Sequence, residues 1–228
     1  MKQMHYNAAE LDPLILFADN HLLAVNKPAA LLTQDSGTGR KNLEDWSREW
    51  VRVDKQKSGN VFLHAVHRID KDVSGIVLFA RTSKALARLN KEIRTHACKK
   101  IYHAWVQGVP SPATAELRHG LIHQNHRAQI CSLQTPDAQE ARLHYKTLQT
   151  KEKRALLEID LETGRYHQIR AQLAFIGHPI LGDIKYGANA RSQLGIALQH
   201  VQLQINHPTL QKPLKITVPK SNQIGDES

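Results

Sequence analysis

The segment from His67 to Ala80, HRIDKDVSGIVLFA, joins a polar loop to a strongly apolar run. Ser74-Gly75 is a turn signal, and the apolar residues after it predict a buried strand over 76–80. Asp70 is then an acid on a loop held by a buried strand, a position where catalytic groups are common. Two interpretations stay open from the residues alone: Asp70 acts on a substrate, or it caps a turn or pairs with Arg68.

The composition indicates a globular protein with a polyanionic partner. The chain has 228 residues, of which 41% are hydrophobic, enough for a sizeable core. Its 31 Lys and Arg residues against 21 Asp and Glu give a net charge of +10, which favours a nucleic acid as partner, with simple solubility as the alternative. Only 5% of the residues are aromatic, so a platform that stacks bases along a single strand is not supported.

Signals for secretion or membrane insertion are missing from the sequence. No apolar run approaches the roughly 20 residues that span a bilayer, and residues 1–13 lack the apolar core of a secretory signal. Cys98 and Cys131 are too few for a disulfide framework or a four-cysteine zinc site. We therefore expect a cytoplasmic protein with no membrane partner.

Hydrophobic patterning predicts a mixture of strands and helices. The expected strands are a hairpin over 14–25 and the ranges 99–108, 140–149, 154–161, 200–205 and 214–218. The expected helices begin near Asn42, at Thr82 or Ser83, and at Tyr166, the last one ending at Ile176. In the first helix Leu43, Trp46 and Trp50 are expected on the apolar face. The second carries Lys84, Arg88, Lys91 and Arg94, which form either a solvated face or a track for RNA phosphates.

Two histidine patterns raise the question of a metal site. They are His64, His67 and Asp70, and later His119, His123 and His126. Zinc ligands three residues apart usually share a helical face, but the first group leads into a predicted strand and the second lies in polar sequence without an acid. There is also no phosphate-binding loop motif, and neither cysteine has the setting of a nucleophile. We therefore expect no metal site.

Four stretches in a fixed order carry a family resemblance. They are DNHLLAVNKPAALLTQ from Asp19, HRIDKDVSGIVLFART from His67, KKIYHAWVQG from Lys99, and LETGRYHQIRAQLAFIGHPILGDIKYG from Leu161, with a weaker fifth, ALQHVQLQINHP, from Ala197. Together they resemble the RluA-type RNA pseudouridine synthases. The resemblance implies an α/β fold of the α+β type, with a mostly antiparallel central mixed sheet, flanking helices and an active cleft between two lobes.

The resemblance implies conversion of uridine to pseudouridine within ribosomal or transfer RNA. This reaction has no redox step and no net hydrolysis, so it requires no cofactor. Asp70 resembles the family's essential aspartate, Tyr102 the tyrosine of its K-x-Y motif, and Arg170 the basic residue that pairs with the aspartate. An ionised carboxylate can attack the sugar or the base, and the uridine must first be flipped out of its stack.

Further residues are expected to contact the RNA. They are Arg68, His67, Lys99, Arg165, His167 and Lys27, with Arg68 placed to enter the vacated stack. Arg165, His167 and Arg170 lie at or near a helix start, where backbone amides and arginines suit an anion. Two departures from the family pattern, Val73 in place of threonine and Tyr166 in place of threonine or serine, bear on packing or substrate preference.

The resemblance also implies a domain organisation. We expect a single catalytic domain over 1–228 with a core from about 14 to 218, no separate N-terminal RNA-binding domain, and a monomer. Two rival functions remain to be tested: a non-catalytic RNA-binding protein with the same fold, and a metal-dependent nuclease built on the histidine clusters. The set of Asp70, Tyr102 and Arg170 argues against the first, and the lack of an acidic metal site argues against the second.

Overall fold

The computed structural model describes residues 7–37, 39–56, 58–190 and 195–225, and it divides into two compact units. Unit 1 contains Met1–Cys98 and Leu203–Val218, and unit 2 contains Lys99–Gln202 and Pro219–Ser228. The chain therefore enters unit 2 after Cys98 and returns to unit 1 within one strand. Residues 1–6, part of the segment expected to lack a secretory signal, lie outside the described residues. The expected single catalytic domain stays a prediction.

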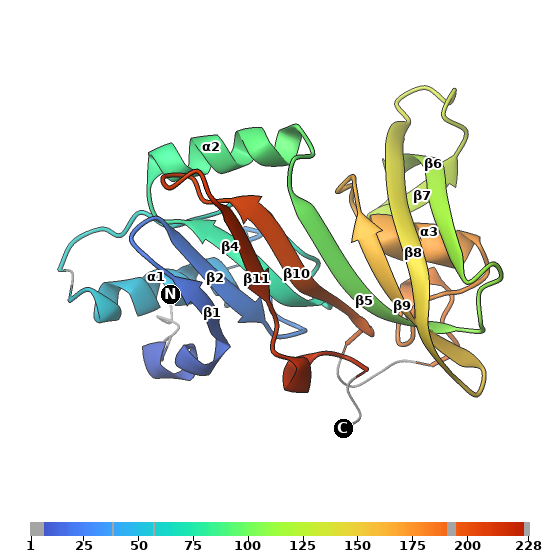
Figure 1. The fold of residues 1–228 in the computed structure, drawn as a ribbon, viewed down its shortest axis with the longest axis horizontal. Coiled ribbons are helices and arrows are strands. Elements are labelled where there is room, and N and C mark those ends of the chain that lie inside the picture. The colour runs from blue at the N-terminus through green and yellow to red at the C-terminus, as the bar shows by residue number, and fades with distance from the viewer. Residues whose placement is uncertain (1–6, 38, 57, 191–194, 226–228) are drawn as a thin grey trace. The chain divides into compact units, whose positions relative to one another are not determined.

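Unit 1 is built on the strands of a mixed sheet (Figure 1). They are β1 (Ile15–Ala18), β2 (Leu22–Lys27), β3 (His64–Ala65), β4 (Ser74–Ala80), the second half of β10 (Leu198–Asn206), and β11 (Pro213–Thr217). The predicted hairpin is confirmed, because β1 and β2 pair and Asp19 Oδ1 accepts hydrogen bonds of 2.7 Å from the amides of His21 and Leu22. Along β2, the pairing with β4 runs from Leu22 opposite Ala80 to Lys27 opposite Gly75.

Two helices of unit 1 begin at side-chain caps. These are α1 (Leu43–Asp54), capped by Asn42, and α2 (Ser83–Arg94), capped by Thr82, as the sequence predicts. The expected apolar face of α1 is wrong in part, because its buried residues are Leu43, Ser47 and Val51. Trp46 and Trp50 are half-buried, and their indole N–H groups donate to Asn7 O and Asp12 Oδ1. A tryptophan N–H needs a polar partner, which keeps these rings near the surface.

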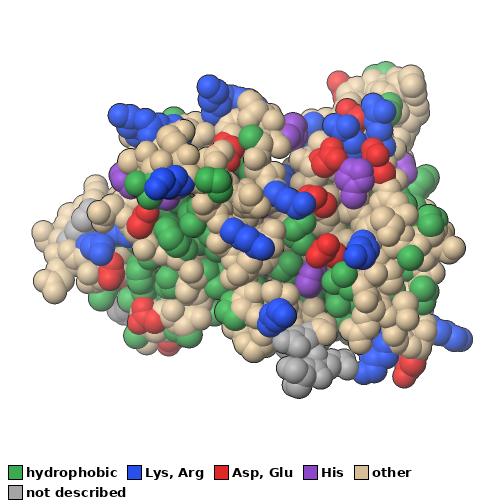
Figure 2. Space-filling view, in the orientation of Figure 1, with side chains coloured by type: hydrophobic (Ala, Val, Ile, Leu, Met, Phe, Trp, Pro, Cys, Tyr) green, Lys and Arg blue, Asp and Glu red, His purple; other side chains and the backbone are tan. Residues whose placement is uncertain are grey.

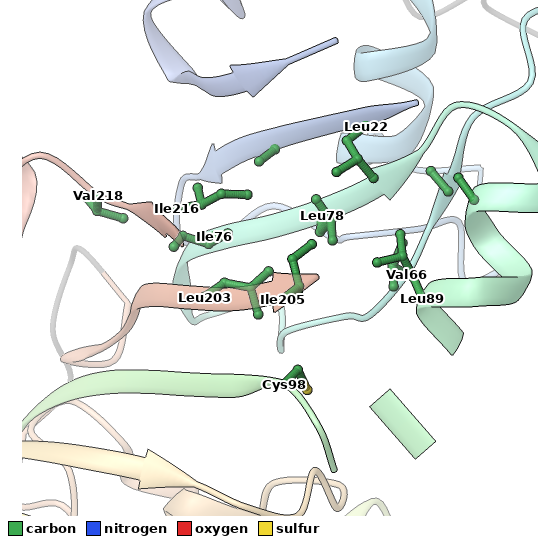
Figure 3. Close-up of a cluster of buried hydrophobic side chains, with 13 residues drawn as sticks. Leu22, Val66, Ile76, Leu78, Leu89, Cys98, Leu203, Ile205, Ile216 and Val218 are labelled. Carbon is green, nitrogen blue, oxygen red and sulfur yellow. The ribbon is translucent and has the colours of Figure 1, made fainter. Parts of the chain in front are cut away.

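The hydrophobic core of unit 1 surrounds β4 (Figure 3). Ile76 and Leu78 of β4 are 0% exposed and belong to the same cluster as Leu89 of α2 and Leu203 of β10. Val66, the residue before His67, is also in this cluster. Each such buried side chain contributes about 1.5–3 kcal/mol of hydrophobic stabilisation. The core therefore anchors the loop over 67–73 at both of its ends.

Unit 2 contains a second set of antiparallel strands. They are β5 (Lys99–Gln107), β6 (Thr114–Gln124), β7 (Arg127–Cys131), β8 (Gln139–Lys151), and β9 (Arg154–Leu161). Their order is β5-β9-β8-β6-β7, and each of these neighbours pairs in antiparallel fashion. Strands β6 and β7 are not among those predicted from the sequence, because the alternation of polar and apolar residues covers only 114–118 of β6 and β7 has only five residues. Asn125 and His126, with φ of 50° and 56°, form the turn between them.

Helix α3 (Gln168–Phe175) lies in unit 2 and is shorter than the predicted range of 166–176. The side chain of Gln172 is fully buried, and its Nε2 donates to the carbonyls of Leu117 and Ala141 at 3.2 Å each. This amide ties α3 to β6 and β8. The 3₁₀ turns are η1 (Ala8–Glu10), η2 (Asp12–Leu14), η3 (Ile184–Tyr186) and η4 (Lys220–Asn222).

The predicted fold class, a mostly antiparallel mixed sheet with helices, is confirmed by a mixed 11-stranded sheet and three α-helices in the described part of the chain. The remaining expected strands are found as β5, β8, β9, β10 and β11, with bounds that differ by a few residues. No helix in the described ranges combines the length and the apolar character that crossing a bilayer demands.

Candidate functional site

The Asp70 loop, residues 67–73, is held close to β4 on unit 1. Ile69 and Val73 are buried, at 7% and 3% exposure, whereas Asp70 is half-buried and Arg68 is exposed. A backbone hydrogen bond of 3.1 Å from Val73 N to Asp70 O closes the turn. Two buried apolar anchors thus flank an acid that reaches the surface of its unit. This arrangement suits a carboxylate that must meet a ligand in a fixed orientation.

Lys27 supports this loop through a hydrogen bond to its backbone. Its side chain is 0% exposed, and its ammonium donates to the carbonyls of Pro28, Leu31 and Lys71 at 2.9, 2.7 and 3.0 Å. Burial lowers the pKa of Lys27 to about 7, against the attraction of the nearby carboxylates of Asp72 and Asp70. The predicted RNA contact of Lys27 does not fit this geometry, because no part of the side chain reaches solvent. Its contact with the Lys71 carbonyl makes it a support of the Asp70 loop.

Two further side chains fasten the same loop. Thr33 is buried, and its hydroxyl donates to Ile69 O at 3.0 Å and accepts from Ile69 N at 3.4 Å. His67 is half-buried, and its Nε2 accepts a hydrogen bond of 3.2 Å from the amide of Leu78 on β4. A ring nitrogen that accepts from an amide carries no proton, so this contact requires the neutral imidazole. The predicted RNA contacts of His67 and Arg68 stay predictions.

The basic residues of α2 form an exposed face on unit 1. Lys84, Arg88, Lys91 and Arg94 are all exposed, and Figure 2 shows Lys and Arg side chains over this helix. A cavity of about 470 Å³ lies at the end of α2, where Arg88, Lys91 and Glu92 line it together with the segment that follows β10. Arg88 Nη1 donates to the carbonyl of Pro208 in this segment. Both interpretations of the face, solvated surface and phosphate track, are compatible with this exposure.

Arg170, on α3 of unit 2, makes a buried ion pair. Its Nε donates to Asp183 Oδ2 at 2.7 Å and its Nη2 donates to Oδ1 at 2.9 Å. Both side chains are buried, at 6% and 1% exposure. The guanidinium carbon also lies 5.0 Å from the ring centre of Tyr186. A bidentate pair of this kind sets both the position and the plane of the guanidinium.

His167 precedes α3 in a left-handed conformation. Its φ is 51°, which is uncommon outside glycine and costs about 1–3 kcal/mol. Its Nδ1 lies 2.9 Å from the hydroxyl of Tyr186, which also accepts from Ala128 N at 2.8 Å. Burial, followed by the charges of Arg170 and Lys185, lowers the pKa of His167 to about 3. The ring is therefore neutral at physiological pH and is a poor partner for a phosphate by charge.

The turn that carries Arg165 is shaped by a buried amide. Gln168 Oε1 accepts from the hydroxyl of Thr163 at 2.8 Å and from the amide of Arg165 at 3.0 Å. Arg165 is exposed, and its Nε donates to Glu140 O at 3.0 Å. Lys99, at the start of β5, is exposed as well and pairs with Asp160 at 3.1 Å. Arg165 and Lys99 stay predicted RNA contacts.

Tyr102 lies in the middle of β5, opposite Ile159 of β9. The residue is 6% exposed, and its ring stacks on His200 of β10 with the ring centres 4.5 Å apart and an interplanar angle of 13°. Stacking on a fully buried histidine holds the phenol plane in one orientation. A tyrosine held in this way can present a preset ring or hydroxyl to a ligand.

The structure divides the predicted residues into two groups. Unit 1 carries those of the Asp70 loop and its support, and unit 2 carries Tyr102, Lys99 and the residues around α3. Sequence reasoning missed four buried residues that hold these groups: Thr33, Gln168, Asp183 and Tyr186. All four lie within the stretches that carry the family resemblance, but their spacing gives no role to them, because a buried polar residue is recognised only through its partners.

The histidine patterns do not form metal sites in the described part of the chain. His119 and His123 both lie on β6, where residues four apart share a face but are separated by about 13 Å. His126 lies in the turn after β6. Within the described ranges, no three His, Cys, Asp or Glu side chains converge in a way that would hold a metal ion.

Residues 21–175 match the family model for RNA pseudouridylate synthase. The uncharacterized RNA pseudouridine synthase YhcT of Bacillus subtilis is 33% identical over 210 residues, which cover 87% of this chain and 65% of that protein. Ribosomal large subunit pseudouridine synthase C of Vibrio parahaemolyticus is 30% identical over 223 residues, or 95% of this chain and 68% of that protein. The chain thus spans about two thirds of the length of these relatives.

A solved structure shares the fold. The human RNA pseudouridylate synthase domain containing 4 matches with a TM-score of 0.78 at 24% identity, over 93% of this chain and 90% of that one. The human RNA pseudouridylate synthase domain containing 1 matches with a TM-score of 0.72 at 18% identity, over 90% of this chain and 82% of that one. These likenesses confirm the predicted fold.

Proposed function

The chain belongs to the RNA pseudouridylate synthase family, and we propose that it isomerises uridine to pseudouridine within an RNA chain. In this reaction the bond from ribose to N1 of uracil breaks, a bond from ribose to C5 of the same base forms, C5 loses its proton and N1 gains one. The observation that carries the proposal is the match over residues 21–175, which includes Asp70, Tyr102 and Arg170.

Asp70 is proposed as the reacting carboxylate. It attacks the sugar or the base, or stabilises positive charge that develops on the ribose. Support comes from the local structure, since Lys27, Thr33 and the core around β4 restrain the loop on which Asp70 lies. A restrained carboxylate loses less freedom when it reaches the geometry of attack.

Arg170 and Tyr102 are proposed to assist this carboxylate. Arg170 supplies the positive charge that the family resemblance assigns to the partner of the aspartate, and Asp183 holds its plane. Tyr102 stacks on the uracil or moves a proton between base and solvent. The stack with His200 supports a preset phenol.

The RNA is proposed to bind through basic side chains and to present a flipped uridine. Arg68, Lys99 and Arg165 are exposed and would contact phosphates or bases, and Arg68 would fill the space that the uridine leaves. His67 and His167 are also proposed to contact the RNA, each as a neutral imidazole ring. By the names of the relatives, ribosomal RNA is the first substrate to test, with transfer RNA next. A cytoplasmic monomer without a cofactor remains our proposal for the protein's state.

The test is Asp70→Asn, because it replaces the carboxylate with a neutral group of nearly the same size. We expect pseudouridine formation to fall by about 1,000-fold or more, since loss of a reacting group removes several kcal/mol of transition-state stabilisation. The measurement is release of tritium from RNA labelled at C5 of uridine, with RNA isolated from cells that lack the gene.

Asp72→Asn is the matched control, since Asp72 lies on the same loop, is half-buried and also attracts Lys27. It should keep activity within a few-fold. Full activity in Asp70→Asn would overturn the proposal and favour the non-catalytic RNA-binding alternative. A loss of activity with a chelator would instead favour the metal-dependent nuclease.

A further inference from the structure

Four aromatic rings of unit 2 follow one another in a row, defined here as the ring stack of Tyr186, His167, Tyr166 and His123. His167 and Tyr186 meet edge to face at 78°, and His123 is tilted by 44° against Tyr166. The centres of His167 and Tyr186 are 5.6 Å apart, those of Tyr166 and His167 are 3.8 Å apart, and those of His123 and Tyr166 are 4.3 Å apart. The planes of Tyr166 and His167 differ by only 17°, so this central pair is stacked face to face.

The ring stack runs from the interior of unit 2 to its surface. Tyr186 is 5% exposed, His167 is half-buried, Tyr166 is 37% exposed, and His123 is exposed on β6. Its inner end touches the Arg170 guanidinium, which lies 5.0 Å from the Tyr186 ring centre. The stack therefore connects a proposed functional arginine with an aromatic surface.

Cations lie beside the ring stack, near its inner ring Tyr186 and near the His126 carbonyl that also accepts from the Tyr166 hydroxyl. Arg127 lies with its guanidinium carbon 5.0 Å from the Tyr186 ring centre, and Lys185 donates to the carbonyl of His126. Arg127, Lys185 and Arg165 are all exposed. Aromatic rings between exposed cations are the usual means by which proteins hold unpaired nucleotides, since bases stack on rings and phosphates pair with the cations.

The ring stack departs from the family pattern at one position. Tyr166 stands where the resemblance leads us to expect threonine or serine, neither of which has a ring to stack. Its hydroxyl also donates to His126 O at 3.2 Å, which fastens the turn between β6 and β7. Two roles are therefore separable in the same side chain: the hydroxyl braces the turn, and the ring extends the stack.

We propose that the outer end of the ring stack, His123 backed by Tyr166, binds an unpaired base of RNA by stacking. The proposal deepens the proposed function and rests on it, since the base would belong to the substrate RNA near the target uridine. The low aromatic content of the whole chain does not oppose this site, because a few rings gathered at one place suffice for one base. Binding of this base would make the protein prefer target uridines that have an unpaired base at a matching position in the RNA.

Photo-crosslinking tests the contact directly. The probe is a single-stranded RNA of ten uridines in which 5-iodouridine replaces one uridine, since iodouracil crosslinks to aromatic side chains on which it stacks. Irradiation of the full-length Asp70→Asn protein with this probe, followed by mass spectrometry, is expected to place a crosslink at His123 or Tyr166. Crosslinks that avoid both residues would overturn the proposal.

Affinity measurements separate stacking from bracing. His123→Ala and Tyr166→Thr are expected to raise the Kd for the fluorescein-labelled ten-uridine RNA by about 5- to 20-fold, within the range for loss of one base stack. Tyr166→Phe keeps the ring and loses only the hydroxyl, so its Kd should stay within about twofold of that of the parent. If Phe and Thr weaken binding equally, the residue only braces the turn and the proposal is wrong.

The outcome is distinguishable from failure of the proposed function. Asp70→Asn tests the reacting carboxylate through tritium release, whereas the crosslink and the Kd of His123→Ala test the base site. A crosslink at His123 together with full activity of Asp70→Asn would support the base site and refute the catalytic role. Loss of activity in Asp70→Asn with normal binding by His123→Ala would refute the base site alone.

Discussion

Lys27 in unit 1 and Arg170 in unit 2 are both buried cations that hold functional segments, but they are neutralised differently. Lys27 donates to three backbone carbonyls, which carry only partial charge. Arg170 donates twice to the full negative charge of Asp183. The pKa of Lys27 falls to about 7 because burial outweighs the attraction of the nearby acids. The guanidinium keeps its proton at any physiological pH.

Buried cations hold functional segments of this protein in two ways. A lysine on carbonyls gives a support whose charge changes near neutral pH, and its neutral amine has only two N–H groups for three acceptors. An arginine on a carboxylate gives a support whose charge does not change with pH but which needs the carboxylate to balance it. The stability of unit 1 should therefore change with pH, and the stability of unit 2 should fall when Asp183 is removed.

The largest expected effect is that of Asp183→Ala. It leaves the buried Arg170 cation without its carboxylate, and we expect the free energy of unfolding to fall by about 3–5 kcal/mol. Urea unfolding followed by circular dichroism measures this loss. Glu140→Ala removes the partner of Arg118 in an exposed pair and should leave the urea midpoint unchanged. Equal midpoints for the two variants would show that the buried pair does not hold unit 2.

The next effect is the pH dependence contributed by Lys27. Its folded-state pKa of about 7 lies below the usual 10.5, so between these values the unfolded chain binds more protons and stability must rise with pH. The stability gained at higher pH is lost again as the pH falls towards 7. Lys27→Met keeps the apolar stem and removes the titration. The unfolding free energy of the wild type relative to Lys27→Met should therefore increase by roughly 2 kcal/mol from pH 7 to pH 9.

Urea titrations of both proteins at several pH values provide the check. Asp183→Ala serves as the contrast, since the guanidinium of Arg170 does not titrate in this range. A wild type and a Lys27→Met variant with parallel pH profiles would mean that Lys27 keeps its charge when buried, and the contrast between the two units would disappear.

The smallest effects come from two buried threonines that hold equivalent turns. Thr33→Val removes the hydroxyl that binds Ile69, next to Asp70, and Thr163→Val removes the hydroxyl between Gln168 and the amide of Arg142. Each should lower the unfolding free energy by about 1 kcal/mol, because each change takes a hydroxyl partner away from a buried backbone group. Only Thr33→Val should also lower kcat several-fold with KM unchanged.

Tritium-release kinetics and urea unfolding on the same preparations test this pair. If Thr163→Val lowers kcat as much as Thr33→Val, the precise position of the Asp70 loop is not what limits the reaction. If neither changes kcat, the loop tolerates the lost hydrogen bond.

Local sequence patterns predicted much of the fold. The turn at Asp19, the cap at Thr82 and the apolar run of β4 are signals within a few residues, and each element formed where expected. Strands β6 and β7 escape prediction because the alternation covers only residues 114–118 of β6 and β7 has only five residues. The buried face of α1 was misjudged because hydrophobicity scales ignore the hydrogen bond that an indole N–H requires.

The sequence by itself determined the family, the likeness of Asp70, Tyr102 and Arg170 to its functional residues, and the α+β fold class, because these depend on residue identity and order. Only the tertiary structure decided that Lys27 is a buried support, that Asp183 holds Arg170, and that His123 and Tyr166 extend a ring stack to the surface. Burial and partner choice join residues that lie far apart along the chain, and they alone decide whether a charged or aromatic side chain meets solvent, a ligand or its own protein.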